Sequence, residues 1–155
     1  MKYKILIVCL ENICRSPLAA GLLNFAAESK NLADHLEIDS AGTAASHIGQ
    51  APDPRALSTA ANHGFALTHE GRQIDQDDLD YFDEILVMDE INFKDVMALT
   101  STPVQKSKIR LMTEYDPRKQ KSKSILDPRD GDLDQFEEVY EQLWYCCMGF
   151  LARAK

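Results

Sequence analysis

A cysteine and an arginine lie six residues apart in a segment typical of an anion-binding loop. Cys9 ends an apolar run, and Arg15 stands just before Ser16 and Pro17, where a helix is expected to begin. A loop between a buried strand and a helix N-terminus can turn its backbone N–H groups toward an anion. The guanidinium of Arg15 can bind two phosphate oxygens, and the same field favours the thiolate of Cys9. The spacing therefore predicts a nucleophilic sulfur beside a bound phosphoryl group.

The residues between these two supply the other groups of the predicted phosphate site. Together with Arg15, the phosphate-binding residues would be Leu10, Glu11, Asn12, Ile13 and Cys14. Among them, Asn12 tolerates the left-handed backbone that such a loop requires. A cysteine and an arginine at this spacing also occur by chance, as a buried strand residue and a solvated charge. The preceding strand and the following helix favour the functional interpretation.

Cleavage of a phosphate ester also needs a proton donor for the leaving oxygen, and a carboxylic acid is the usual donor. Three Asp-Pro pairs supply candidates, at Asp53, Asp116 and Asp127. Asp53 is explained as a helix cap. The other two both lie in a long polar segment, residues 115–132, which has no clear periodicity and a length that is more often functional than idle. Spacing alone leaves the choice between them open.

Four apolar runs predict the strands that position these residues. The strongest, Tyr3–Cys9, is nearly continuous and is typical of a strand buried on both faces. The weaker runs are Leu36–Ala41, Glu84–Met88 and Ile109–Met112. Each is separated from the next by enough chain for a crossover helix. This alternation predicts an α/β fold with a parallel sheet, whose ligand sites lie at the carboxyl ends of its strands.

Four helices are expected between and after these strands. The first should begin with Ser16 as a hydroxyl N-cap and Pro17 in the first helical position. Its apolar face would comprise Leu18, Leu22, Leu23, Phe25 and Ala26. The other three helices are expected from Asp53-Pro54 to Gly64, over Asp89–Thr100, and over Asp134–Arg153. The last has an apolar stripe at helical spacing that should pack against the sheet.

Size, charge and cysteine usage narrow the class of protein. A chain of 155 residues fits one domain, residues 1–155. A net charge of -8 argues against general nucleic-acid binding. The absence of a signal-like or membrane-length apolar segment predicts a cytoplasmic location and no membrane partner. The cysteines form two close pairs without zinc-site spacing, so no metal is expected, and Cys146 and Cys147 should pack in the last helix.

Residues 8–17 resemble the phosphate-binding loop of the low-molecular-weight protein tyrosine phosphatases: a cysteine, any two residues, then Asn-Ile-Cys-Arg-Ser-Pro. Further segments resemble that family in order and spacing: Asp39–Thr43, Ile48-Gly49, Pro52-Asp53, His63-Gly64, His69, Arg72–Ile74, Met88-Asp89, Tyr115–Pro117 and Phe136–Phe150. The resemblance implies a four-stranded parallel twisted sheet flanked by helices on both faces, with no metal or other cofactor. It also implies hydrolysis of phosphotyrosine or related aryl phosphates through a phosphocysteine, with inorganic phosphate as product and inhibitor.

The resemblance assigns roles to the residues of the chemical step. Cys9 would be the nucleophile, Arg15 would bind and stabilise the transferring phosphoryl group, and Ser16 would donate a hydrogen bond to the thiolate. The family's acid precedes a proline shortly before the last helix, which selects Asp127 as general acid and then as base.

The resemblance also implies a supporting network and a redox role. Asn12, Ser40 and His69 would hold the loop in its strained shape, although Ser16 and His69 also have simpler readings as a helix cap and an ordinary loop histidine. Cys14 shares the loop with Cys9, so a disulfide between them would block activity reversibly and shield the thiolate from deeper oxidation. The alternative for Cys14 is a core cysteine.

The chain departs from the family pattern at the rim of the expected cleft. Glu11 replaces the usual glycine, and its side chain is expected to point outward. Arg129 and Asp130 stand where the family usually has aromatic residues after Asp-Pro, and His47 stands where another aromatic often lines the cleft. Because those aromatics sandwich the phosphotyrosine ring, their absence weakens the case for that particular substrate.

Two alternatives to a tyrosine phosphatase remain. A phosphate-binding module without turnover is suggested by Glu11 and the missing aromatics. An arsenate reductase on the same scaffold would need a relay of further cysteines around residues 80–90, and the sequence has none there. Retention of Cys9, Arg15 and Asp127 together favours the enzyme that hydrolyses phosphate esters.

Overall fold

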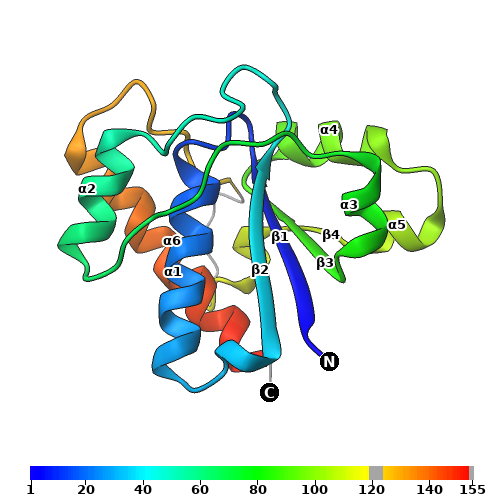
Figure 1. Ribbon diagram of the computed structural model, residues 1–155, viewed down its shortest axis with the longest axis horizontal. Helices are drawn as coiled ribbons and strands as arrows, with labels where there is room; N and C mark the ends of the chain where they lie inside the picture. The colour runs from blue at the N-terminus through cyan, green and yellow to red at the C-terminus, as the bar shows by residue number, and fades with distance from the viewer. Residues whose placement is uncertain (119–123, 154–155) are drawn as a thin grey trace.

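Four parallel strands form one sheet in the order β2-β1-β3-β4 in the computed structural model, which describes residues 1–118 and 124–153. The strands are β1 (Tyr3–Cys9), β2 (Leu36–Gly42), β3 (Glu84–Val87) and β4 (Ile109–Leu111). The connection from β1 runs to one side of the sheet and later strands are added on the other side, so the order reverses at β1. Such a reversal opens a crevice at the carboxyl ends of the strands. The loop after Cys9 begins at this crevice (Figure 1).

Helices cover both sides of the sheet (Figure 1). One side carries α1 (Arg15–Ser29), α2 (Pro54–Asn62) and α6 (Leu133–Arg153). The other carries α3 (Gln76–Tyr81), α4 (Glu90–Leu99) and α5 (Pro103–Ser107). Two short 3-10 turns, Ala33–His35 and Met112–Tyr115, complete the described elements. Within the described residues, no helix combines the length and the apolar character needed to cross a membrane.

Strand β1 is the centre of the core because its side chains are buried on both faces. Ile5 and Ile7 belong to the cluster formed with α1 and α6, while Leu6 and Val8 belong to the cluster on the α4 side. All four are 0% exposed. Alternate residues of a strand point to opposite faces, so burial of both faces requires a continuous apolar run. The sheet, its parallel strands and its two helical layers are as the sequence predicts.

Two short helices and one exposed side chain differ from the sequence-based expectations. Helices α3 and α5 have six and five residues, too few for an apolar period to be visible. Their cap residues, Asp75 and Thr102, were the available signals, since each accepts a hydrogen bond from a backbone N–H of the first turn. Phe25 is 37% exposed, so it is not part of the buried face of α1. Its ring stacks on Phe65 at the surface instead.

The start of α1 is also a correction. Helix α1 begins at Arg15, Cys14 takes the N-cap position, and no side chain caps the helix. Ser16 lies inside the first turn, where its hydroxyl is 3.0 Å from the Cys9 sulfur, so it serves the loop rather than the helix end. The cap of α2 is as predicted: the Asp53 carboxylate accepts from Arg55 N at 2.8 Å, with Pro54 in the first helical position.

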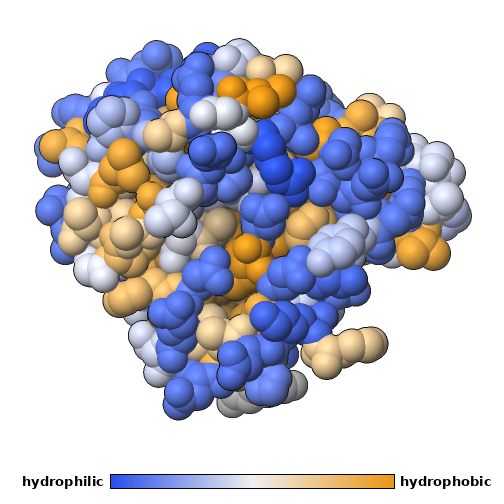
Figure 2. All heavy atoms as spheres, viewed as in Figure 1, coloured by the Kyte–Doolittle hydropathy of each residue, from blue (hydrophilic) through white to orange (hydrophobic). Residues whose placement is uncertain are grey.

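The face of the molecule shown in Figure 2 is mostly polar, and apolar side chains gather on it over α1 and α2. A hollow of about 490 Å3 lies between α1, β2 and residues 65–69. Its lining includes Ser40 and His69 but not Cys9. The hollow is separate from a second, smaller cavity, which is lined by Cys9, Glu11, Ile13, Cys14, Arg15 and Asp127.

Candidate active site

The loop after β1 turns its carbonyl oxygens away from its centre. The carbonyls of Cys9, Leu10 and Ile13 accept hydrogen bonds from backbone N–H groups outside the loop, at 2.8–2.9 Å; the donors are Thr43, Ala44 and Asp53. In a trans peptide the C=O and N–H point in opposite directions. These bonds therefore direct the N–H groups of the following residues, Leu10, Glu11 and Cys14, toward the loop centre. Four N–H groups face inward once Asn12 is included, whose N–H lies 3.3 Å from the Cys9 sulfur.

Close packing against the end of β2 holds the loop in this shape. A Cβ at Gly42 would lie 2.8 Å from the Leu10 carbonyl oxygen and 3.1 Å from Asn12 Cβ, so only glycine lets the loop approach so closely. Asn12 itself adopts φ 60°, the left-handed conformation that the sequence predicts for it. Sequence reasoning did not single out Gly42, although it pairs with Cys9 in the strand register.

The Asn12 side chain ties four neighbours together beneath the loop. Its Nδ2 donates to Ser16 Oγ at 2.8 Å and to Ser40 Oγ at 3.0 Å. Its Oδ1 accepts from His69 Nε2 at 2.6 Å and from the Arg72 backbone N–H at 3.0 Å. The side chain is buried and its hydrogen-bonding capacity is fully used, which holds the left-handed residue in place. The structure thus brings together Asn12, Ser40 and His69.

Ser16 is oriented to donate to the cysteine sulfur. Because Asn12 Nδ2 donates to Ser16 Oγ, the serine hydroxyl proton is directed to another acceptor. The Cys9 sulfur lies 3.0 Å away and the Ala41 carbonyl 3.5 Å away. A thiolate at Cys9 therefore accepts two hydrogen bonds, from the Ser16 hydroxyl and from the Asn12 N–H.

Arg15 is buried beside the cysteine and is held by a carboxylate that sequence reasoning missed. Its Nη1 donates to Asp89 Oδ2 and to the Ile125 carbonyl, both at 2.8 Å. Asp89 also caps α4, since its other oxygen accepts from Asn92 N. The predicted helix start at Asp89 was the available signal, because β1 and β3 are neighbours and their carboxyl ends meet at one edge. Asp89 thus fixes one side of the guanidinium.

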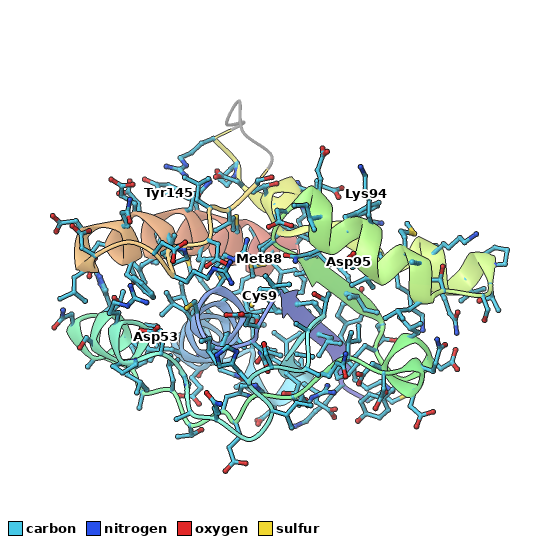
Figure 3. The ribbon with its side chains drawn as sticks, turned by 90° about the horizontal axis from the view of Figure 1, so that it is seen from above. Cys9, Asp53, Met88, Lys94, Asp95 and Tyr145 are labelled. Carbon is cyan, nitrogen blue, oxygen red and sulfur yellow. The ribbon has the colours of Figure 1, made fainter. Side chains whose placement is uncertain are left out.

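The structure brings one of the three candidate acids to the cysteine. Asp127 lines a small cavity with Cys9, Cys14 and Arg15, and its Oδ2 is 3.7 Å from Arg15 Nη2. Figure 3 looks down on this edge of the sheet, with Cys9 at the centre between α2, where Asp53 is labelled, and α4. Asp53 caps α2 there. Of the three candidate acids, only Asp127 lines the described cavity together with Cys9.

Asp116 has a structural position instead. Its side chain is buried, and its oxygens accept from Arg118 Nε at 3.2 Å and Nη2 at 3.0 Å. The segment that follows is described only in part, because residues 119–123 of the long polar stretch lie outside the described residues. The described residues 124–132 include Asp127, which lines the cavity, and the predicted rim residues Arg129 and Asp130.

The rim of the cavity is charged. Glu11 is among the residues that line the cavity; its Oε1 accepts from Arg129 Nη1 at 3.2 Å, and its Oε2 is 3.7 Å from His47 Nδ1. The Arg129 guanidinium and the His47 ring thus hold the Glu11 carboxylate. Asp130 is exposed and does not line the cavity.

Arg55 holds the segment that contains Asp127 by two hydrogen bonds to its backbone. Its Nη1 donates to the Gly131 carbonyl at 2.5 Å and its Nη2 to the Arg129 carbonyl at 2.7 Å. The same guanidinium is paired with Asp53 Oδ2 at 2.8 Å, and the Asp53 N–H binds the Ile13 carbonyl in the phosphate loop. The start of α2 therefore links the loop to the acid segment. Sequence reasoning did not find Arg55.

Three of the four cysteines are held as thiols by burial. Burial, with the nearby carboxylates of Asp53 and Asp127 acting in the same direction, raises the pKa of Cys14 to about 12. Burial likewise raises the pKa of Cys146 to about 12 and that of Cys147 well above its ordinary value. The last two are packing residues of α6, as predicted. Across residues 1–118 and 124–153, no group of three His, Cys, Asp or Glu side chains is placed to hold a metal ion.

The pKa of His69 is lowered, first by burial and then by the charge of Arg72, while Asp39 and Glu70 oppose the shift. Below about pH 6.5, the ordinary histidine value, the unfolded chain therefore binds a proton that the folded protein resists. The free energy of unfolding should fall as the pH drops through this value toward the lower folded pKa, and recover above it.

In the His69→Gln variant, we expect the fall in the free energy of unfolding that comes from His69 at low pH to disappear. Urea unfolding between pH 5 and 8 measures this free energy, and the substitution of the exposed His35, His35→Gln, is the matched control. Equal pH slopes in wild type and His69→Gln would contradict the assignment.

The first strand of this parallel α/β sheet ends at a cysteine sulfur that is surrounded by backbone amides and an arginine guanidinium. This combination of fold and site defines a cysteine-dependent phosphatase. The chain matches the family model described as low molecular weight phosphotyrosine protein phosphatase over residues 4–155. A pig protein of that description is 40% identical over 152 residues, covering 97% of this chain and 95% of the relative. The chain belongs to the low-molecular-weight phosphotyrosine protein phosphatase family.

Solved structures agree with this assignment. A protein tyrosine phosphatase from Entamoeba histolytica superposes with a TM-score of 0.94 at 29% identity, covering 99% of this chain and 97% of that one. The structure described as DARP, Drosophila arginine phosphatase, has a TM-score of 0.89 at 34% identity, covering 100% and 98%. The family implies phosphotyrosine-containing substrates.

Proposed function

We propose that this protein hydrolyses phosphotyrosine, or a related aryl phosphate monoester, through a phosphocysteine intermediate. The observation that carries the proposal is the set of three outward carbonyls, which turns three backbone N–H groups toward the loop centre, where the Asn12 N–H faces the Cys9 sulfur as a fourth. Such a cradle binds the phosphoryl oxygens and stabilises the charge that develops on them during transfer.

In the first step, the Cys9 thiolate attacks phosphorus and forms the S–P bond. The P–O bond to the aryl group breaks as Asp127 gives its proton to the leaving oxygen, and the products are a phenol and phosphocysteine. Arg15, fixed by Asp89 on one side, stabilises the equatorial oxygens. Asp127 lies on the cavity wall with the sulfur, which is where a proton donor for the leaving group is needed.

In the second step, water attacks the phosphorus of phosphocysteine. The Asp127 carboxylate takes a proton from that water, the S–P bond breaks, and inorganic phosphate leaves with the Cys9 thiolate restored. The hydrogen bonds from Ser16 and the Asn12 N–H to the sulfur stabilise the thiolate as leaving group. Phosphate, as the product, is expected to inhibit by binding the same cradle.

A substrate panel tests this function. We expect the wild-type protein to cleave p-nitrophenyl phosphate and a phosphotyrosine peptide. A phosphoserine peptide of the same sequence should react at least about tenfold more slowly in kcat/KM, because a site for an aryl phosphate holds a short alkyl chain poorly. Phosphoarginine belongs in the panel because one relative is described as an arginine phosphatase. Phosphate binding without phenol release would instead support the binding-module alternative.

The redox pairing of Cys9 with Cys14 is a further part of the proposal. A peroxide would oxidise the Cys9 thiolate to a sulfenic acid, and the Cys14 sulfur would then displace its hydroxyl, so that a disulfide and water form. Burial and the high pKa of Cys14 keep this partner mainly as a thiol. Closure of the disulfide should accordingly be slower than it would be with a thiolate partner.

A further inference from the structure

An ion pair between Glu11 and Arg129 links two segments that contribute residues to the wall of the cysteine cavity. Arg129 Nη1 lies 3.2 Å from Glu11 Oε1. Glu11 belongs to the phosphate loop, whereas Arg129 follows the acid Asp127 by two residues on the opposite segment. The pair therefore joins the two halves of the proposed active site.

Glu11 belongs to the wall of the cavity that a phosphate dianion must enter, together with Cys9 and Arg15. Its carboxylate is partly exposed and pairs with Arg129 beside this cavity. At about 6 Å and an effective dielectric near 20, an uncompensated carboxylate would weaken binding of an anion by about tenfold or more. A loop otherwise built to attract phosphate thus carries one group that repels it.

Arg129 is held where it compensates that charge. Its backbone carbonyl accepts from Arg55 Nη2 at 2.7 Å, which fixes the start of the side chain. The guanidinium then reaches Glu11, while its Nε lies 3.9 Å from Asp127 Oδ2. His47 Nδ1, at 3.7 Å from Glu11 Oε2, is a weaker second partner.

We propose that Arg129 determines phosphate affinity through Glu11, as a positioning and charge-compensating residue that does not touch the reacting atoms. The proposal rests on the proposed phosphatase function and adds to it a pair of residues that sets substrate affinity. As a consequence, the phosphate affinity depends on whether the charges of Glu11 and Arg129 cancel. Loss of the Arg129 charge leaves the Glu11 carboxylate uncompensated, and loss of both charges removes the repulsion.

Four proteins test this: wild type, Arg129→Met, Glu11→Gln and the double variant. The readouts are the inhibition constant of inorganic phosphate and the KM and kcat for p-nitrophenyl phosphate. We expect Arg129→Met to weaken phosphate binding about tenfold, with a parallel rise in KM and a smaller change in kcat. Glu11→Gln should bind phosphate as tightly as wild type or more tightly. The double variant should return to within about threefold of wild type, and the effect of Arg129→Met should shrink at high salt.

Other outcomes overturn the proposal. If the double variant binds phosphate as weakly as Arg129→Met, Arg129 contacts the phosphate directly. If Arg129→Met lowers kcat while the inhibition constant is unchanged, Arg129 acts on Asp127 instead. The matched control is Arg118→Met, which removes an arginine paired with Asp116 outside the cavity and should leave phosphate affinity unchanged.

Phosphate binding by calorimetry keeps this test separate from the proposed function. If wild type releases no phenol, the proposed hydrolysis fails. The order of phosphate affinities among the four proteins would still decide whether Glu11 and Arg129 compensate each other.

Discussion

Cys9→Ser is expected to abolish turnover of p-nitrophenyl phosphate while the folded protein still binds inorganic phosphate. A serine hydroxyl is not ionised near neutral pH, whereas the site directs the Ser16 hydroxyl and the Asn12 N–H at a sulfur that must carry negative charge. Without an anionic nucleophile the S–P bond cannot form, and the two-step path is closed. Release of p-nitrophenolate measures the rate, and phosphate calorimetry shows whether the cradle is intact.

Cys14→Ser is the matched control for this variant. Cys14 lies in the same loop and is equally buried, but its pKa is raised and its sulfur serves no step of the proposed path. It should keep most of the wild-type turnover. Activity that survives in Cys9→Ser and disappears in Cys14→Ser would reassign the nucleophile.

Asp127→Asn should slow turnover by about 100-fold or more, which is the usual contribution of a positioned general acid. The amide keeps the size of the side chain but can neither protonate the leaving oxygen nor activate water. The loss should be greatest for phosphotyrosine, whose leaving phenol has an ordinary pKa near 10. It should be smaller for p-nitrophenyl phosphate, whose leaving group is a weaker base. Steady-state kcat for the two substrates measures both effects.

Asp116→Asn is the control that the sequence itself provides, since both residues are followed by proline. Asp116 is buried and paired with Arg118, so its substitution should lower the free energy of unfolding and leave kcat near the wild-type value. A large loss of kcat in Asp116→Asn with little loss in Asp127→Asn would reverse the assignment of the acid.

The parts of this protein that the sequence predicts are those encoded in contiguous segments. The run from Tyr3 to Cys9 predicts β1 because a strand buried on both faces must be apolar throughout. The residues from Cys9 to Arg15 predict the cradle because the groups that form it all belong to one short loop. Asn12 adopts the predicted left-handed backbone for the same local reason.

The parts that the sequence does not reveal depend on contacts between distant segments. In the sequence, Asp89 marks only the start of an expected helix and Arg55 has no assigned role. Only the folded chain places Asp89 against Arg15 and Arg55 against the Arg129 carbonyl. The orientation of Glu11 is a similar case, because the cation that attracts it lies 118 positions further along the chain. Gly42 is required by a backbone that approaches from another strand.

The most direct test of the central claim is to stop wild-type turnover of p-nitrophenyl phosphate with acid during the steady state and to map phosphorylated peptides by mass spectrometry. We expect phosphate on the peptide that contains Cys9, attached to sulfur, and none on that peptide in Cys9→Ser. Rapid turnover with phosphate on a different residue, or with no phosphoprotein at any quench time, would contradict the phosphocysteine mechanism.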